Sequence, residues 1–154
     1  MDILDKQILK ELMDNGRVTL AELSEKLGLS SPSLSERMKK LERQGIIKGF
    51  AAIVDPEKIG FHLLAFIEVT LEKPSHRHSF LAMVGNTEEI TECHHTAGDF
   101  DYLLKVRCRN TAHLETLISD RIKSVEGVVR TRTNIVLSTI KETPSLPVAT
   151  EASS

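Results

Sequence analysis

The side chains best suited to chemistry in this chain are basic residues that gather between residues 31 and 49. This stretch carries five basic and two acidic residues, a net charge of +3, whereas residues 1–30 carry four basic and six acidic residues. The whole chain of 154 residues has a net charge of −2, so no global charge attracts it to a polyanion. Because a local cluster of cations neutralises phosphates, we expect residues 31–49 to lie against a nucleic acid.

Three of these cations, Lys39, Lys40 and Arg43, fall on one side of a predicted helix over residues 31–44, and Arg37 lies at the flank of that side. At about 100° per residue, Leu34, Met38 and Leu41 form an apolar stripe, and the charged side chains lie opposite it. A charged helix face is often only a solvated surface, but a second capped helix and a glycine turn precede this one, which is typical of a helix-turn-helix. The predicted helix would then enter a DNA major groove. The candidates for base edges are Ser33, Glu36, Lys39 and Lys40, and the candidates for phosphates are Ser31, Arg37 and Arg43.

Local signals indicate where the two helices of this motif begin and end. Thr19 and Glu22 have the spacing of a capping box, so the first of them should begin directly after Thr19. It should end at Gly28, because glycine adopts the left-handed conformation of a helix stop most easily. Ser31 is the expected N-cap of the second helix, with Pro32 in its first position, where the missing N–H costs nothing.

A third helix and a strand complete the predicted first domain. Residues 2–14 form the helix, which Asp2 caps. Residues 46–54, IIKGFAAIV, have the composition of a strand that leaves the bundle. The turn-rich residues 55–60 then mark a boundary, so we assign residues 1–54 to a helix-turn-helix domain with a linking strand.

Strands and helices alternate in the rest of the chain. The predicted strands cover residues 62–72, 89–97, 102–109 and 128–141, and the predicted helices cover residues 76–85 and 111–124. This βαββαβ order predicts a ferredoxin-like domain over residues 61–142, with both helices on one face of an antiparallel sheet, and an α+β protein overall. The free sheet face favours a homodimer. Residues 143–154, rich in Pro, Ser, Ala and Thr, are expected to be a disordered tail.

Other kinds of chemistry find little support in the sequence. Cys93 and Cys108 are too few for a disulfide framework, and neither lies in the motif of an activated nucleophile. His94 and His95 would point to opposite faces of a strand, which makes a poor metal site. We therefore predict neither an enzyme nor a metal centre. No apolar run reaches the ~20 residues that cross a bilayer, and so few cysteines suit a cytoplasmic protein.

The motifs resemble those of the Lrp/AsnC family of leucine- and asparagine-responsive transcription regulators. The resemblance covers residues 1 to about 142 and rests on LDKQILKELMDNGR, SPSLSERMKKLERQGIIKGF, GDFDYLLKVR at residues 98–107 and GVVRTRTNIVLST at residues 127–139. It implies an N-terminal winged-type DNA-binding domain and a C-terminal domain that binds an effector and oligomerises. It also implies dimers that assemble further, often into octamers, with DNA wrapped around the particle.

The resemblance further implies an amino-acid effector near the loop between the second and third strands of the second domain. A free amino acid is a zwitterion, so its site needs an acceptor for the ammonium and donors for the carboxylate. Asp101 could supply the acceptor and the backbone N–H groups of the loop the donors. Gly-Asp-Phe-Asp is also a good turn without any ligand. The implied effector-binding residues are Gly98, Asp99, Phe100, Asp101 and Tyr102, with Asn134, Ile135 and Val136 on the last strand.

The sequence therefore predicts a sequence-specific DNA-binding regulator whose assembly or DNA binding responds to a free amino acid. Its expected partners are double-stranded DNA, the amino acid and further copies of the chain, and no other cofactor is expected. Asn134 stands where the leucine-responsive member has an aromatic residue, which argues against leucine itself as the effector. Three alternatives stay open: an architectural DNA-wrapping protein without an effector, a metal-responsive regulator, and an enzyme domain fused to a DNA-binding head.

Overall fold

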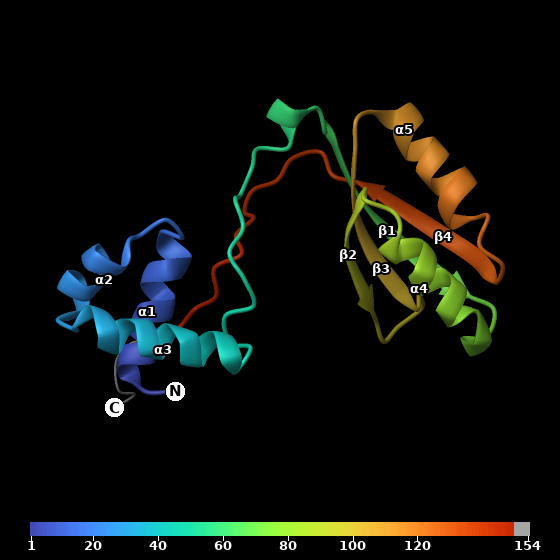
Figure 1. Ribbon diagram of the computed structural model, residues 1–154. Helices are drawn as coiled ribbons and strands as arrows, with labels where there is room; N and C mark the ends of the chain where they lie inside the picture. The colour runs from blue at the N-terminus through green and yellow to red at the C-terminus, as the bar shows by residue number, and fades with distance from the viewer. Residues whose placement is uncertain (150–154) are drawn as a thin grey trace. The chain divides into compact units, whose positions relative to one another are not determined.

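The computed structural model describes residues 1–149, which form two compact units (Figure 1). One unit comprises Met1–Ile53 together with residues 141–149, and the other comprises Val54–Ile140. The second unit therefore interrupts the first in sequence. Each unit is built around a hydrophobic core of its own.

Three helices make up most of the first unit: α1 (Ile3–Asp14), α2 (Leu20–Leu27) and α3 (Ser31–Arg43). The predicted caps of the first two helices are confirmed. Asp2 caps α1 in a capping box with Asp5, and Thr19 and Glu22 form the expected capping box of α2. Gly28 ends α2 with a φ of 63°, in the left-handed region that favours glycine.

The start of α3 differs from the prediction by one residue. Its N-cap is Ser30, whose side chain accepts a hydrogen bond from the Ser33 N–H at 3.4 Å. Ser30 has the extended backbone that an N-cap needs, whereas Ser31 is already helical. Pro32 consequently occupies the second helical position, where its missing N–H still removes no helical hydrogen bond.

Four side chains, each at most 1% exposed, make the buried core of this unit: Ile8, Leu23, Leu34 and Leu41. The segment after Lys141 packs against the same unit. The Ser145 hydroxyl lies 3.3 Å from the Met13 carbonyl oxygen, and the Leu146 N–H lies 3.4 Å from the Met13 sulfur. Residues 143–149 of the predicted tail thus form neither helix nor strand but do contact α1. Residues 150–154 of that tail lie outside the described residues.

The predicted strand over residues 46–54 is wrong. Within the described chain these residues pair with no other strand, and the apolar side chains of Phe50, Ile53 and Val54 are exposed. A strand forms only where a neighbour supplies hydrogen-bond partners for its backbone. A composition typical of strands is therefore not enough here.

The second unit has the predicted βαββαβ order, with strands β1 (Leu63–Leu71), β2 (Ile90–His95), β3 (Tyr102–Cys108) and β4 (Val128–Ile135) and helices α4 (Arg77–Gly85) and α5 (Thr111–Thr116). Short 3₁₀ turns precede β1 and α4, at Glu57–Ile59 and Pro74–His76, and a π-helical turn, Leu117–Ile122, continues α5. The sheet is antiparallel in the order β2-β3-β1-β4. The last strand ends at Ile135 instead of residue 141, because its pairing with β1 ends at Ala65 and Leu64.

Both helices of this unit cover the same face of the sheet (Figure 1). Ile67 and Leu104 lie on that face and pack with Phe80 of α4 and with Leu114 and Ile122 of the α5 segment. The opposite face carries charged and apolar side chains of alternate residues: Leu64, Phe66, Glu68, Leu103, Lys105, Arg130 and Arg132. None of the described helices is long and apolar enough to cross a membrane.

Candidate DNA-recognition helix and effector site

The outward face of α3 contains five of the seven residues predicted for DNA contact. The side chains of Ser33, Glu36, Lys39, Lys40 and Arg43 are exposed, whereas Leu34 and Leu41 are buried against the rest of the unit. Glu36 and Arg43 form an ion pair at 3.2 Å, but with side chains 72% and 62% exposed this pair is weak and screened. Lys39 and Lys40 form no ion pair within the described residues, so both are available to phosphates or base edges.

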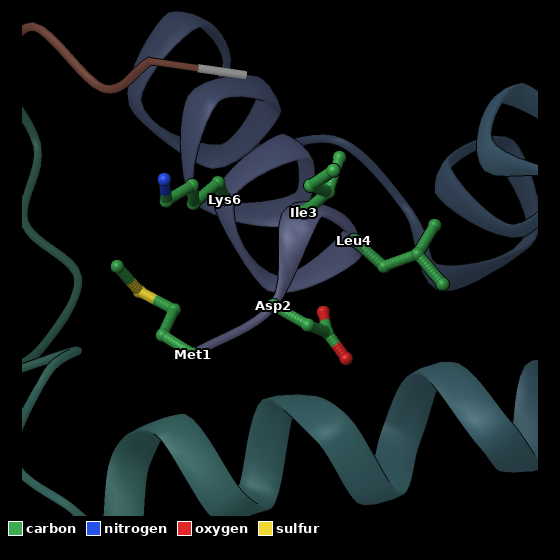
Figure 2. A pocket seen from close by; sticks show the side chains of 5 residues that line it. All are labelled: Met1, Asp2, Ile3, Leu4 and Lys6. Carbon is green, nitrogen blue, oxygen red and sulfur yellow. The ribbon is translucent and has the colours of Figure 1, made fainter. Parts of the chain in front are cut away.

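A wide surface pocket of about 460 Å³ lies at the start of α1 (Figure 2). Its lining side chains, those of Met1, Asp2, Ile3, Leu4 and Lys6, point in different directions around the first turn. The Asp2 carboxylate is already engaged by Arg37. Because a binding site needs polar groups that converge on a ligand, this pocket is not a candidate site.

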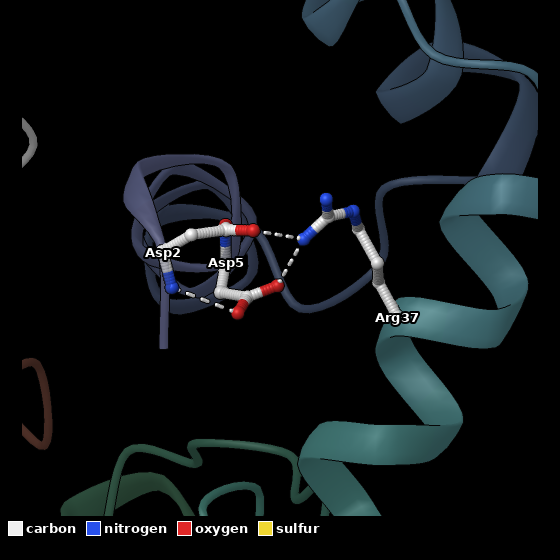
Figure 3. Close-up of polar contacts among 3 residues, drawn as sticks. All are labelled: Asp2, Asp5 and Arg37. Atoms are coloured by element: carbon white, nitrogen blue, oxygen red, sulfur yellow. Dashed lines mark hydrogen bonds and ion pairs between the residues drawn. The ribbon is translucent and has the colours of Figure 1, made fainter.

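The side chain of Arg37 extends from α3 toward the start of α1, away from the exposed face of α3 (Figure 3). Its Nη1 atom donates to Asp2 Oδ2 and to Asp5 Oδ1, both at 2.7 Å. The backbone N–H of Asp5 and then the Arg37 guanidinium lower the pKa of Asp2, and the two carboxylates raise the pKa of Arg37. Two carboxylates at the start of α1 therefore hold the guanidinium, and its predicted phosphate contact stays a prediction. Ser31 contacts α2 through its hydroxyl, 3.4 Å from that of Ser24.

The turn of residues 98–101 borders a pocket of about 250 Å³ at one end of the sheet. Gly98, Asp99 and Phe100 line it, together with Glu68 of β1 and Arg132 of β4. The remaining lining residues are Thr96, Ala97 and Leu103. This pocket, which we call the turn pocket, therefore combines apolar surface with charged residues of both signs, acidic Glu68 and Asp99 and basic Arg132.

Phe100 is held under two arginines of β4. The guanidinium carbons of Arg130 and Arg132 lie 4.3 Å and 4.8 Å from the centre of its ring. Arg130 also donates to the carbonyl oxygen of Asp99 at 2.8 Å. These contacts are cation–π interactions, and they fix the turn against the last strand.

Glu68 and Arg132 were not identified from the sequence. Arg132 donates to both carboxylate oxygens of Glu68, with Nη2 at 2.8 Å from Oε1. This bidentate pair lowers the pKa of Glu68, and Asn134 acts in the same direction. The alternation of β4 places Arg130, Arg132 and Asn134 on one face, but only the pairing of β1 with β4 brings that face to Glu68.

Asp101 anchors the turn to β1. Its Oδ2 atom accepts a hydrogen bond from the Leu71 N–H at 2.7 Å, and its own N–H donates to Val69 at 3.0 Å. With Tyr102 it lines a second pocket of about 210 Å³, together with Leu71, Lys73, Pro74, Arg77 and His95. Tyr102 and Leu103 point to opposite faces of β3, so the five loop residues implied by the resemblance divide between two pockets on the two faces.

The three residues predicted on the last strand lie at the end of β4 (Asn134 and Ile135) and directly after it (Val136). Thr131 pairs with Val69 beside the turn, whereas Asn134 pairs with Phe66, three residues away and so roughly 10 Å along the strand. Asn134 shares a face with Glu68 and influences its pKa, but Ile135 and Val136 line neither pocket. Within one chain, Asn134 therefore does not line the turn pocket but interacts with Glu68, which does.

Thiol and metal chemistry gain no support from the described residues. Burial raises the pKa of Cys93, and burial with the charge of Glu89 raises the pKa of Cys108 to about 11. Both thiols therefore stay protonated near neutral pH and are poor nucleophiles. No group of three or more His, Cys, Asp or Glu side chains in residues 1–149 is placed to hold a metal ion.

Comparison with known proteins finds one matching family in each of the two units of the structure. The family model for the winged helix-turn-helix DNA-binding domain matches residues 1–48, and that for the Lrp/AsnC ligand binding domain matches residues 64–146. The chain is 40% identical over 152 residues to the leucine-responsive regulatory protein of Salmonella typhimurium, a match covering 97% of this chain and 93% of that protein.

Two solved structures are similar over nearly the whole chain. One is the transcriptional regulator NMB0573 of Neisseria meningitidis in complex with L-Met, with a TM-score of 0.91, 36% identity and 96% of each chain covered. The other is the feast or famine regulatory protein of M. tuberculosis complexed with L-methionine, with a TM-score of 0.88, 34% identity and coverage of 96% of this chain and 99% of that one. The chain therefore belongs to the Lrp/AsnC family of non-enzymatic, DNA-binding transcription regulators, with a helix-turn-helix at its start and an amino-acid ligand-binding domain after it.

Proposed function

We propose that this regulator binds specific DNA sequences through α3 and that a free amino acid, bound in the turn pocket, modulates that binding. The observation that carries the proposal is the charge of each sign beside the turn. Glu68 can accept from an ammonium group, and Arg132 can donate to a carboxylate. The N–H groups of Gly98, Asp99 and Phe100 donate to no protein acceptor within the described residues, so they can serve the carboxylate as well.

The proposed effector is a neutral amino acid of medium size, with methionine as the first candidate. Ala97, Phe100 and Leu103 give the turn pocket apolar surface for such a side chain. Two of the similar solved structures, from Neisseria meningitidis and M. tuberculosis, are complexes with methionine. Asp101 supports the site by holding the turn in place, since its carboxylate bonds to the backbone of β1.

We propose further that copies of the chain pair through the sheet face that no helix of the unit covers. Phe66 and Leu103, both half-buried in one chain, lie on this face among charged side chains, and burying such surface stabilises a dimer. Assembly of dimers into an octamer and a cytoplasmic location remain predictions from the sequence. Asn134, Ile135 and Val136, which lie away from the turn pocket in one chain, would contact the effector only if a second dimer brought them to it.

The proposed effector site is tested by thermal unfolding with a panel of amino acids, followed by DNA titration with any amino acid that raises the unfolding temperature. We expect methionine to raise it for the wild-type protein and for Glu92→Gln, but much less for Glu68→Gln. Glu92 is the matched control because it also pairs with a cation on the same sheet face, Lys105, but lies outside the turn pocket.

Three other outcomes would change the assignment. DNA binding without any response to an amino acid would favour the architectural, DNA-wrapping alternative. A metal that copurifies with the protein and alters its DNA binding would favour a metal-responsive regulator. An equal response of Glu68→Gln and wild-type protein to methionine would remove Glu68 from the site.

A further inference from the structure

The Arg37 guanidinium joins the DNA-recognition helix to the start of α1 (Figure 3). The capping box uses one oxygen of each carboxylate: the Asp5 N–H donates to Asp2 Oδ1 at 2.8 Å, and the Asp2 N–H donates to Asp5 Oδ2 at 3.0 Å. The other oxygen of each carboxylate accepts from Arg37. The cap of α1 and its link to α3 are thus a single network of three side chains.

Burial makes this link difficult to exchange for a phosphate. The Asp5 side chain is only 4% exposed, and Arg37 forms an ion pair with it at 2.7 Å. If Arg37 left, a buried carboxylate would lose the cation that compensates for its lost hydration. The exposed pair of Arg43 with Glu36 carries no such penalty, because water can solvate both groups when the pair opens.

We infer that Arg37 is a positioning residue for DNA recognition, which with Asp2 and Asp5 fixes the orientation of α3 against α1 and contacts no phosphate. This rests on the proposed role of α3 in binding specific DNA. Base contacts by α3 depend on accurate placement of the helix, whereas the attraction of its lysines to phosphates tolerates small displacements. Loss of Arg37 therefore lowers sequence selectivity more than it lowers affinity for DNA in general.

The test compares Arg37→Gln with Arg43→Gln, the same substitution on the same helix at an exposed arginine. Affinities are measured over a range of salt concentrations for two duplexes of equal length: one selected with the wild-type protein from a randomised library, and one of random sequence. For Arg37→Gln we expect the ratio of the two affinities to fall at least about fivefold, the loss of one base contact, with an unchanged salt slope. For Arg43→Gln we expect an unchanged ratio and a salt slope smaller by about 0.9, the loss of one phosphate contact.

A second variant, Asp2→Asn, gives opposite results under the two roles of Arg37. Asparagine remains a good N-cap, and the Asp2 side chain is 54% exposed, so the variant keeps the fold. If Arg37 positions α3, Asp2→Asn lowers selectivity without changing the salt slope. If Arg37 contacts a phosphate, releasing it from Asp2 strengthens binding to both duplexes and steepens the slope.

The inference is overturned if Arg37→Gln flattens the salt slope as Arg43→Gln does, or if Asp2→Asn strengthens binding to both duplexes. If Arg37→Gln does not fold, Asp2→Asn alone decides between the two roles. Failure of the proposed function looks different, because the wild-type protein would then enrich no sequence from the library.

Discussion

The two units of this protein achieve rigidity in different ways. The DNA-binding unit has a buried core of four side chains in the described residues and links its helices with ion pairs, Arg37 with Asp5 and Lys26 with Glu11. The ligand-binding unit has eleven buried core residues and a hydrogen-bonded sheet. The first unit should therefore be sensitive to the loss of single side chains, and the second to changes that disturb its backbone.

The largest expected effect is that of a truncation in the small core. Ile8→Ala removes a fully buried side chain of α1 and should lower the free energy of unfolding of the DNA-binding unit by about 4 kcal/mol. Calorimetry should show an early transition for this unit, with the transition of the ligand-binding unit nearly unchanged. Equal shifts of both transitions would contradict the independence of the two cores.

A backbone position should have the next largest effect, in the ligand-binding unit. Gly127 has a φ of +89°, and a Cβ atom there would lie 2.2 Å from Cγ of His76. Overlap and strain together should make Gly127→Ala cost about 3 kcal/mol in denaturant unfolding. Gly85→Ala in α4 is the control, since its Cβ would meet nothing within 4 Å. Similar stabilities of the two variants would mean that His76 does not pack on Gly127.

Most features set by nearby residues were predictable from the sequence, as was the βαββαβ order, whereas individual contacts between distant residues were not. The caps at Asp2 and Thr19 and the helix stop at Gly28 depend on residues within one turn, and all three are confirmed. The strand over residues 46–54 was predicted wrongly, since its formation depends on a partner strand that composition does not reveal.

The candidate sites show the same division. The exposed face of α3 follows from helical periodicity alone. The binding of Arg37 to Asp5 joins residues 32 positions apart, and that of Arg132 to Glu68 joins residues 64 positions apart. No local pattern encodes these contacts, so the partners of Arg37 were not predicted and Glu68 was missed.

The smallest expected effect is a loss of folding stability at acidic pH. The Arg132 hydrogen bonds lower the pKa of Glu68 below its ordinary value of 4.5, and the Asp5 N–H and Arg37 lower that of Asp2 below 3.8. Each carboxylate therefore contributes stability that is present above its ordinary pKa and is lost as the pH falls through its lower folded value. Both units should lose stability in this acidic range.

Arg132→Gln should weaken that pH dependence in the ligand-binding unit only, as followed by acid titration of the two unfolding transitions. An equal change in both units would contradict the assignment of Glu68.

The most direct test of the account is the salt dependence of DNA binding by the double variant Lys39→Ala/Lys40→Ala. Both lysines are exposed on α3 and form no ion pair within the described residues. If α3 is the DNA-binding surface, affinity should fall and the slope of log affinity against log salt should decrease by up to about 1.8, the value for two phosphate contacts. An unchanged affinity and slope would show that DNA binds elsewhere on the molecule.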